Sequence, residues 1–197
     1  GGSNSTDPRD VDTDDDGLED TTVLFADISK DGKEHPSEDA KSFRGSPAHG
    51  GLRYPTGLVF KGNDCYVATT QEIRIYRDTD GDGTADQSEQ FATGWPFTMH
   101  YFDWTFGLRF GPDGYLYTIL CTDYLNAGRK PDPKGMRGSL LRIGPDGKDI
   151  EVFCNGLRYA YDLAFNDAGD LFFTDNKGGG NPTEELNHAV KGGNYGH

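Results

Sequence analysis

Two short stretches of the sequence carry aspartate at alternate positions, as the binding of a hard cation such as calcium requires. The stretch at 78–89 has carboxylates at loop positions 1, 3, 5 and 9, a glycine at position 6 and a glutamate at position 12. Short acidic side chains two residues apart converge on one point when the chain curls, and the glycine permits the sharp turn. The candidate ligands are Asp78, Asp80, Asp82, Thr84 through its carbonyl oxygen, Asp86 and Glu89.

The same pattern occurs earlier, at 12–20, with Val23 at the twelfth position. Its candidate ligands are Asp12, Asp14, Asp16 and Asp20. For both loops the alternative is an acidic, solvated turn that binds no ion.

The residues before the second loop indicate what kind of calcium loop this is. An EF-hand needs an amphipathic helix there, with apolar residues three and four apart. Instead, Ile73 and Ile75 alternate with Arg74 and Arg77. A period of two predicts a strand, so we expect the loop in a β-hairpin or at the edge of a propeller blade.

Composition and charge point to an all-β protein. The chain has 197 residues, 34% of them hydrophobic, with 28 glycines and 10 prolines, a mix that suits short strands joined by tight turns. The net charge of −14 argues against nucleic acid and anionic membranes as partners. No apolar run approaches the ~18 residues of a membrane span.

The cysteines and the calcium loops bear on the compartment. There are three cysteines and no Cys-x-x-Cys or Cys-x-x-Cys-His motif. We expect Cys65, Cys121 and Cys154 to be buried thiols, with a Cys121–Cys154 disulfide as the alternative. The sequence shows no signal peptide, and calcium loops favour a calcium-rich compartment. We therefore expect a mature exported protein, periplasmic or extracellular.

A repeated hairpin organises the rest of the chain. Three units begin near residues 54, 104 and 161, and each consists of an apolar strand, an Asp/Asn/Gly turn and an alternating strand. Four strands per ~40–50 residues predict β-propeller blades. A two-sheet sandwich would not explain the repeat. The chain holds about three to four blades, so either it is a fragment or another chain completes the ring.

The expected domain organisation follows from these elements. Residues 1–10 are predicted to be a flexible N-terminal arm, and residues 11–197 the propeller blades, which include both calcium loops. Residues 27–50 are polar and without periodicity, and are predicted to be a surface insertion.

The C-terminal motifs resemble a known family. They are Asn155-Gly156-Leu157-Arg158, the hairpin that ends in Asp175-Asn176, Glu184-Glu185-Leu186-Asn187 and Asn194-Tyr195-Gly196. In order and spacing they are similar to motifs of the six-bladed propellers of soluble quinoprotein glucose/sorbosone dehydrogenases. The nearest likeness is to the membrane-bound dehydrogenase propellers predicted in planctomycete-type bacteria.

This resemblance implies a function and a site. Family members hold pyrroloquinoline quinone (PQQ) over the central funnel and oxidise a sugar or alcohol, passing electrons to an acceptor such as a c-type cytochrome. His100 stands where the family places its catalytic base, and an imidazole can accept a proton at neutral pH. The alternative for His100 is a structural histidine. Arg158, Asp175 and Asn176 are the implied cofactor-binding residues.

Two other functions compete. One is a non-catalytic propeller, a calcium-stiffened scaffold or carbohydrate-binding module in an extracellular complex. In that case the aromatic side chains of Trp95, Tyr101, Trp104 and Tyr124 could stack on sugars. The other is a hydrolase of the lactonase type with a central calcium, against which the contiguous, hairpin-borne Asp loops argue.

Overall fold

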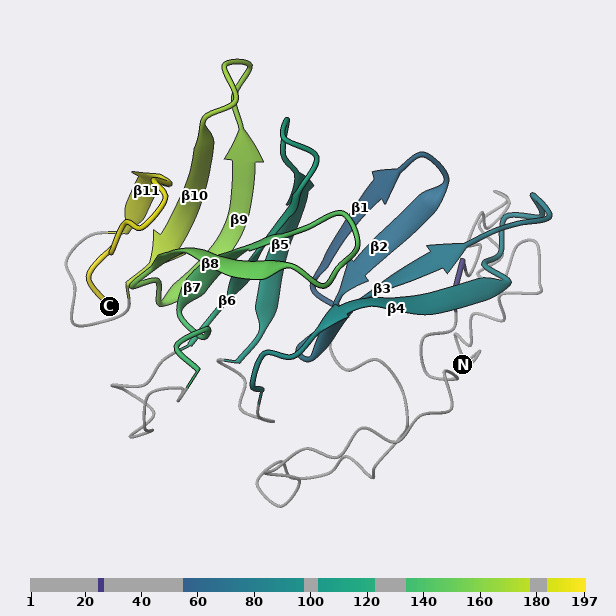
Figure 1. Cartoon of the computed structure of the whole chain (residues 1–197), viewed down its shortest axis with the longest axis horizontal. Helices are drawn as coiled ribbons and strands as arrows, with labels where there is room; N and C mark the ends of the chain where they lie inside the picture. The colour runs from purple at the N-terminus through teal and green to yellow at the C-terminus, as the bar shows by residue number, and fades with distance from the viewer. Residues whose placement is uncertain (1–24, 27–54, 98–102, 123–133, 178–183) are drawn as a thin grey trace, which may run out of the picture.

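The protein folds into three antiparallel β-sheets that follow one another along the chain. The computed structural model describes residues 25–26, 55–97, 103–122, 134–177 and 184–197. In each sheet every strand pairs with its neighbour in sequence (Figure 1). The first sheet contains β1 (Gly57–Lys61), β2 (Asp64–Ala68), β3 (Glu72–Arg77) and β4 (Gln87–Thr93). The second contains β5 (Thr105–Phe110), β6 (Leu116–Leu120), β7 (Ser139–Ile143) and β8 (Ile150–Asn155). The third contains β9 (Tyr159–Phe165), β10 (Leu171–Asn176) and β11 (Glu185–His188).

Turn chemistry fixes the hairpins that the sequence predicts. Between β5 and β6, the N–H of Gly114 donates to the carbonyl of Gly111 at 2.9 Å, and Gly114 has a φ of 80°. A left-handed residue in a tight turn is best supplied by glycine. The carboxylate of Asp113 accepts the N–H of Tyr115 at 3.2 Å and closes the same turn.

The sheets pack face to face through two apolar clusters. One joins the first and second sheets and includes Ile73, Ile75 and Leu108. The other joins the second and third sheets and includes Ile119 and Leu163. The first strands of successive sheets lie side by side, since β1 contacts β5 and β5 contacts β9. This is the arrangement of blades around a propeller axis.

The two ends of the strands differ in the connections they carry. Short turns at 62–63, 111–115, 144–149 and 166–170 and the 78–86 loop join strands at one end. At the opposite end, where β9 begins (Figure 1), the chain makes its long connections at 94–104, 121–138 and 177–184. Binding residues concentrate on long connections held by a rigid scaffold. A functional site is therefore expected at this end, called the long-connection end below.

The predicted all-β fold, a partial propeller, is confirmed, with one difference in strand count. The first two sheets have four strands, whereas the third has three among the residues that the structure describes. The described part of the chain contains no helix long and apolar enough to cross a membrane.

All three cysteines are free and buried, so the alternative of a Cys121–Cys154 disulfide is wrong. Burial raises the pKa of the Cys65 thiol, and it raises that of Cys154 to about 12. These thiols are therefore protonated and unreactive at neutral pH.

Candidate functional site

Several charged side chains are buried together near the beginning of β9. Asp103, Arg137, Arg158 and Asp175 are each less than a tenth exposed, and the side chain of Lys177 is 5% exposed. Charged side chains are rarely buried unless they are paired and hydrogen-bonded. This polar cluster at the long-connection end is the candidate site.

Asp175 organises the cluster from the end of β10. One carboxylate oxygen accepts the backbone N–H of Arg158 at 3.1 Å, and the other accepts that of Tyr159 at 2.8 Å. Both oxygens are thus engaged with the start of β9, the adjacent strand. Asp175 therefore positions this segment.

Lys177 supplies the positive charge that balances Asp175. Its ammonium lies 3.0 Å from a carboxylate oxygen of Asp175 and 3.4 Å from Glu185. It also donates to the carbonyl oxygens of Gly156 at 3.2 Å and Tyr195 at 2.7 Å. One buried lysine thus ties together β10, β11, the link before β9 and the C-terminal segment.

Arg158 is held through Asn176. The guanidinium donates to the side-chain oxygen of Asn176 at 2.9 Å and to its backbone carbonyl at 3.0 Å. The structure therefore brings together the three implied cofactor residues, Arg158, Asp175 and Asn176. His100, the implied base, lies outside the described residues.

Arg137 is a second buried cation at this end. Its guanidinium donates to the backbone carbonyls of Thr70 at 2.9 Å, Pro96 at 2.7 Å and Trp104 at 3.1 Å. It therefore fastens the connections of the first two sheets together. Sequence reasoning missed both Arg137 and Lys177, because neither belongs to a recognisable motif. Only the position of Lys177 directly after Asp175 and Asn176 could have suggested it.

Cys121 lies inside the same region. It is fully buried, and its thiol donates to the carbonyl oxygen of Ala160 at 3.1 Å. Burial raises its pKa far above the usual value, so it has no nucleophilic role.

A cavity of about 310 Å³ opens beside the cluster, on the uncovered face of the third sheet. Tyr161 and Leu186 contribute its apolar surface, and its polar lining is made by Thr174, Asp175, Asn176, Glu184 and Glu185. The carboxylates and amide could accept and donate hydrogen bonds to a polyhydroxylated molecule.

The second Asp loop joins β3 to β4 at the short-turn end. Carboxylate oxygens of Asp78, Asp80 and Asp82 all lie within 4.8 Å of one another. Asp78 accepts the backbone N–H groups of Gly81 at 2.7 Å and Gly83 at 2.9 Å. The hydrogen bond from Gly83 is the main cause that lowers the pKa of Asp78, which is therefore ionised at neutral pH.

Two other candidate ligands of this loop, Asp86 and Glu89, have partners of their own. Asp86 accepts the hydroxyl of Thr79 at 2.6 Å, and Glu89 lies within β4, 2.6 Å from the guanidinium of Arg77. The backbone N–H of Thr84 donates to Asp82 at 2.8 Å. The structure therefore gathers three of the predicted ligands and places Glu89 in an ion pair. The first Asp loop, 12–20, lies outside the described residues.

Of the four aromatic residues predicted to stack on sugars, two lie among the described residues. Trp95 is buried and donates its indole N–H to the carbonyl of Thr70 at 3.1 Å. Trp104 packs against the apolar cluster between the second and third sheets. Both therefore belong to the scaffold, while Tyr101 and Tyr124 lie outside the described residues.

The fold is similar to that of solved sugar dehydrogenase structures. A glucose dehydrogenase structure is 20% identical, with a TM-score of 0.55 over 73% of this chain and 51% of that chain. The PQQ-bound aldose sugar dehydrogenase of Streptomyces coelicolor is 23% identical, with a TM-score of 0.51 over 74% of this chain and 51% of that chain. A calcium structure of a Trichoderma reesei carbohydrate-active enzyme of family AA12 is 18% identical, with a TM-score of 0.53 over 72% of this chain and 43% of that chain.

At these identities the likeness shows a shared propeller fold. The chain spans about half the length of the first two of these structures. No curated protein matches it. The family model described as "Domain of unknown function (DUF7133)" matches residues 46–193, and the chain belongs to that family.

Proposed function

We propose that the protein is an exported, calcium-binding propeller that oxidises a sugar or alcohol with PQQ as cofactor. The observation that carries this proposal is the buried guanidinium of Arg158, oriented by Asn176 at the long-connection end. A planar guanidinium held in place is suited to donate hydrogen bonds to carbonyl and carboxylate oxygens. The propeller fold shared with sugar dehydrogenases supports the same reading.

The donor set at this end suits the quinone. PQQ presents carboxylates and quinone carbonyls, which are hydrogen-bond acceptors. The buried cluster contains three cations, Arg137, Arg158 and Lys177, against two carboxylates, Asp103 and Asp175. Arg158 and Asn176 would bind the quinone, and Asp175 and Lys177 would hold Arg158 in place.

When bound, the quinone supplies the two-electron acceptor that no side chain can provide. The protein would position the substrate carbon and take up its proton, for which His100 is the proposed base. A c-type cytochrome, on another chain or on a segment outside residues 1–197, would receive the electrons, since these residues contain no Cys-x-x-Cys-His motif for covalent haem.

Calcium has a separate, structural role in this proposal. The 78–86 loop joins β3 to β4 at the short-turn end, opposite the Arg158 cluster. The ion would offset the clustered charges of Asp78, Asp80 and Asp82 and fix the hairpin. A calcium-rich compartment outside the cytoplasm is where such a loop would be filled.

Isothermal titration calorimetry of PQQ into the calcium-loaded protein tests the cofactor site. Arg158→Lys keeps the charge but loses the planar fork, so we expect binding to weaken at least about tenfold. Arg142→Lys is the matched control, because Arg142 is also hydrogen-bonded but lies in β7 and contacts Asp113 in a short turn. If wild-type protein does not bind PQQ, or if both variants bind equally well, the proposal is wrong.

A second candidate is a carbohydrate-binding propeller without chemistry. The 310 Å³ cavity favours it, because Tyr161, Asn176 and Glu184 offer a ring and polar groups to sugar hydroxyls. Titration with aldoses in the absence of quinone separates the two. Sugar binding that persists without PQQ, combined with no PQQ binding, would establish the second candidate.

A further inference from the structure

A single buried arginine, Arg137, holds both ends of the connection between the first and second sheets. Its guanidinium donates to the carbonyl oxygen of Pro96 at 2.7 Å, near the start of this connection, and to that of Trp104 at 3.1 Å, at its end. A third hydrogen bond reaches the carbonyl of Thr70 at 2.9 Å, in the turn between β2 and β3. These three contacts are called the Arg137 clamp below. The proposed base, His100, lies between Pro96 and Trp104 in the sequence and outside the described residues.

The guanidinium group makes this triple contact possible. It presents five N–H groups in one rigid plane, so it can donate to three carbonyl oxygens in different directions. Because Arg137 is 5% exposed, the hydrogen bonds are protected from competition with water. A lysine at this position would keep the charge but not the planar fork, and would lose at least one of the three contacts.

The residue after Arg137 holds the segment that carries Arg158. The backbone N–H of Leu157 donates to the carbonyl of Gly138 at 3.0 Å, and the N–H of Gly138 donates to the carbonyl of Leu120 at 2.7 Å. Gly138 has a φ of 73°, and a Cβ built there would lie 2.9 Å from the carbonyl oxygen of Leu157. Glycine permits this close approach, so two consecutive residues hold the two sides of the candidate site.

The residues directly after β6 connect the same two segments. The N–H of Cys121 donates to the carbonyl of Trp104 at 2.9 Å, and its thiol donates to the carbonyl of Ala160 in β9 at 3.1 Å. The N–H of Thr122 donates to the carbonyl oxygen of Arg158 at 2.9 Å. The end of the connection that contains the proposed base is therefore hydrogen-bonded, through these two residues, to the start of β9.

We propose that Arg137 is a positioning residue for the dehydrogenation. By holding both ends of the connection that contains His100, it fixes where the base lies relative to Arg158. This inference rests on the proposed function, in which Arg158 binds the quinone and His100 accepts the proton of the substrate. A displacement of about 1 Å at the reacting groups can lower the rate about a hundredfold, so a residue that touches neither substrate nor cofactor can control the reaction.

The two tryptophans of the chain are direct probes of the Arg137 clamp. The indole N–H of Trp95 donates to the carbonyl of Thr70 at 3.1 Å, which also accepts Arg137, and the carbonyl of Trp104 accepts Arg137 directly. Arg137→Lys should therefore raise the acrylamide quenching constant of tryptophan fluorescence about twofold or more, because loss of a buried hydrogen bond opens the segment locally. This measurement requires neither quinone nor sugar.

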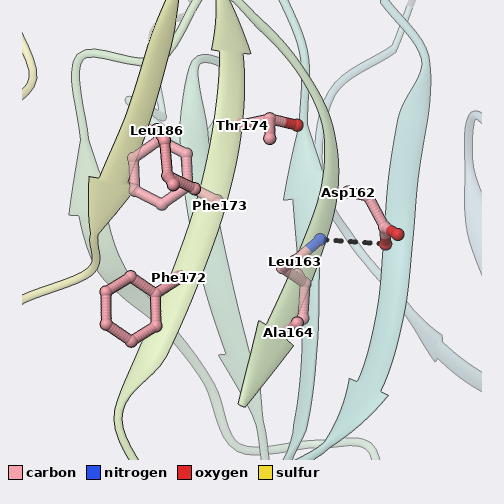
Figure 2. A pocket seen from close by; sticks show the side chains of 7 residues that line it. All are labelled: Asp162, Leu163, Ala164, Phe172, Phe173, Thr174 and Leu186. Atoms are coloured by element: carbon pink, nitrogen blue, oxygen red, sulfur yellow. Dashed lines mark hydrogen bonds between the residues drawn. The ribbon is translucent and has the colours of Figure 1, made fainter. Parts of the chain in front are cut away.

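Two variants are the controls for the fluorescence experiment. Arg142→Lys makes the same change in β7, where the arginine contacts Asp113 in a short turn at 2.8 Å. Asp162→Asn changes β9, the strand that follows Arg158. Figure 2 shows Asp162 accepting the N–H of Leu163 beside an open pocket of about 140 Å³, and none of the described residues that line this pocket belongs to the clamp. Both controls should be quenched like the wild type.

Kinetics of sugar oxidation separate positioning of the base from support of the fold. In protein loaded with calcium and PQQ, Arg137→Lys should lower kcat at least about tenfold while the dissociation constant of PQQ stays near that of the wild type. The hydrogen bonds between Arg158 and Asn176 are left intact, which is why binding is retained. An arginine with a structural role alone would leave kcat per bound PQQ unchanged.

The wild-type protein distinguishes failure of this inference from failure of the proposed function. If the wild type binds no PQQ or oxidises no sugar, the proposed function is wrong, and the positioning role is wrong with it. If the wild type is active but Arg137→Lys matches it in quenching, or matches Arg142→Lys in kcat, the positioning role alone is wrong. Arg137→Gln, which keeps two N–H donors without the charge, replaces Arg137→Lys if the lysine variant does not fold.

Discussion

The carboxylate of Asp175 accepts the backbone N–H of Arg158 at 3.1 Å. This contact crosses from the end of β10 to the start of β9 and fixes where the Arg158 side chain leaves the backbone. Because Asp175 is 2% exposed, the hydrogen bond is protected from water. In the structure Asp175 thus positions the segment that carries Arg158.

Replacing Asp175 with asparagine should destabilise the protein strongly. The amide cannot accept two backbone N–H groups with both of its polar atoms, and it leaves the buried Lys177 without its closest counter-charge. Removing one partner of a buried ion pair costs about 3–5 kcal/mol. Urea unfolding followed by circular dichroism measures the change.

Asp162→Asn provides the comparison for that experiment. Asp162 pairs with Arg109 at the surface, at 3.3 Å, and both side chains are well exposed. Such pairs contribute up to about 1 kcal/mol. Equal losses of stability for the two variants would show that Asp175 does not have the assigned positioning role.

The turn at Gly147 couples the second sheet to the first. Gly147 has a φ of 72°, and a Cβ built there would lie 1.9 Å from the carbonyl oxygen of Phe91 in β4. Gly147→Ala should therefore cost more than the roughly 1–2 kcal/mol of a left-handed alanine. Gly114→Ala is the matched control, since its φ is 80° and nothing lies within 4 Å. Thermal unfolding should rank G147A clearly below G114A, and similar midpoints would refute the close approach.

Calcium should stabilise the wild-type protein increasingly as its free concentration rises above the dissociation constant. A ligand that binds only the folded state adds about 2.7 kcal/mol at a hundred times its dissociation constant. Asp80→Asn removes one charge from the 78–82 cluster, so calorimetry should show one fewer site or a weaker one.

Asp146→Asn controls for turn structure in the calcium experiment. Asp146 also lies in a hairpin turn and accepts a backbone N–H, from Lys148 at 3.0 Å, but it does not belong to the carboxylate cluster. The Asp146→Asn variant should bind calcium as tightly as the wild type. No calcium effect on wild-type stability, or equal loss in both variants, would show that the 78–86 loop is a solvated turn.

Acid should weaken the contact network around Asp113. Burial alone would raise its pKa, but hydrogen bonds from Tyr117 and Arg142 lower it below the usual value. A lowered folded-state pKa stabilises the protein above the unfolded value near 4, and this contribution is lost as the pH falls through the folded-state pKa. Asp113→Asn should therefore be less stable at pH 7, by up to about 1 kcal/mol, and the gap should close in acid.

Alkali should act on the same network through Tyr117. Burial, together with the hydrogen bond to Asp113, raises the pKa of Tyr117 to about 12. A raised folded-state pKa stabilises the protein below the unfolded value near 10, and this contribution is lost as the pH rises from there towards 12. Melting midpoints of wild type and Asp113→Asn across pH 2–11 test both directions, and a gap that widens in acid would contradict the assignment.

Sequence periodicity predicted the hairpins because their cause is local. The alternation of Ile73 and Ile75 with polar residues indicates a strand, and the glycine turns determine where each strand ends. The repeat of the hairpin unit near residues 54, 104 and 161 likewise predicted the blades.

The candidate site was only partly predictable. Arg137 donates to carbonyls of residues 33 to 67 positions earlier in the chain, and backbone carbonyls leave no trace in side-chain patterns. The hydrogen bonds from the backbone N–H groups of Arg158 and Tyr159 to Asp175 also escaped prediction, because side-chain patterns do not show which backbone groups a carboxylate accepts. Glu89 matched an EF-hand position by spacing, but its place in β4 pairs it with Arg77.

The most direct test of the central claim is anaerobic reduction of the quinone by a sugar. Full-length protein loaded with calcium and PQQ would be mixed with aldoses while the quinone absorbance is recorded, with Arg158→Lys measured in parallel. We predict that the absorbance of the oxidised quinone is lost on addition of sugar to the wild type, and that the loss is much slower in the variant. If PQQ binds but no aldose or alcohol changes its absorbance, the claim that the protein is a dehydrogenase is contradicted.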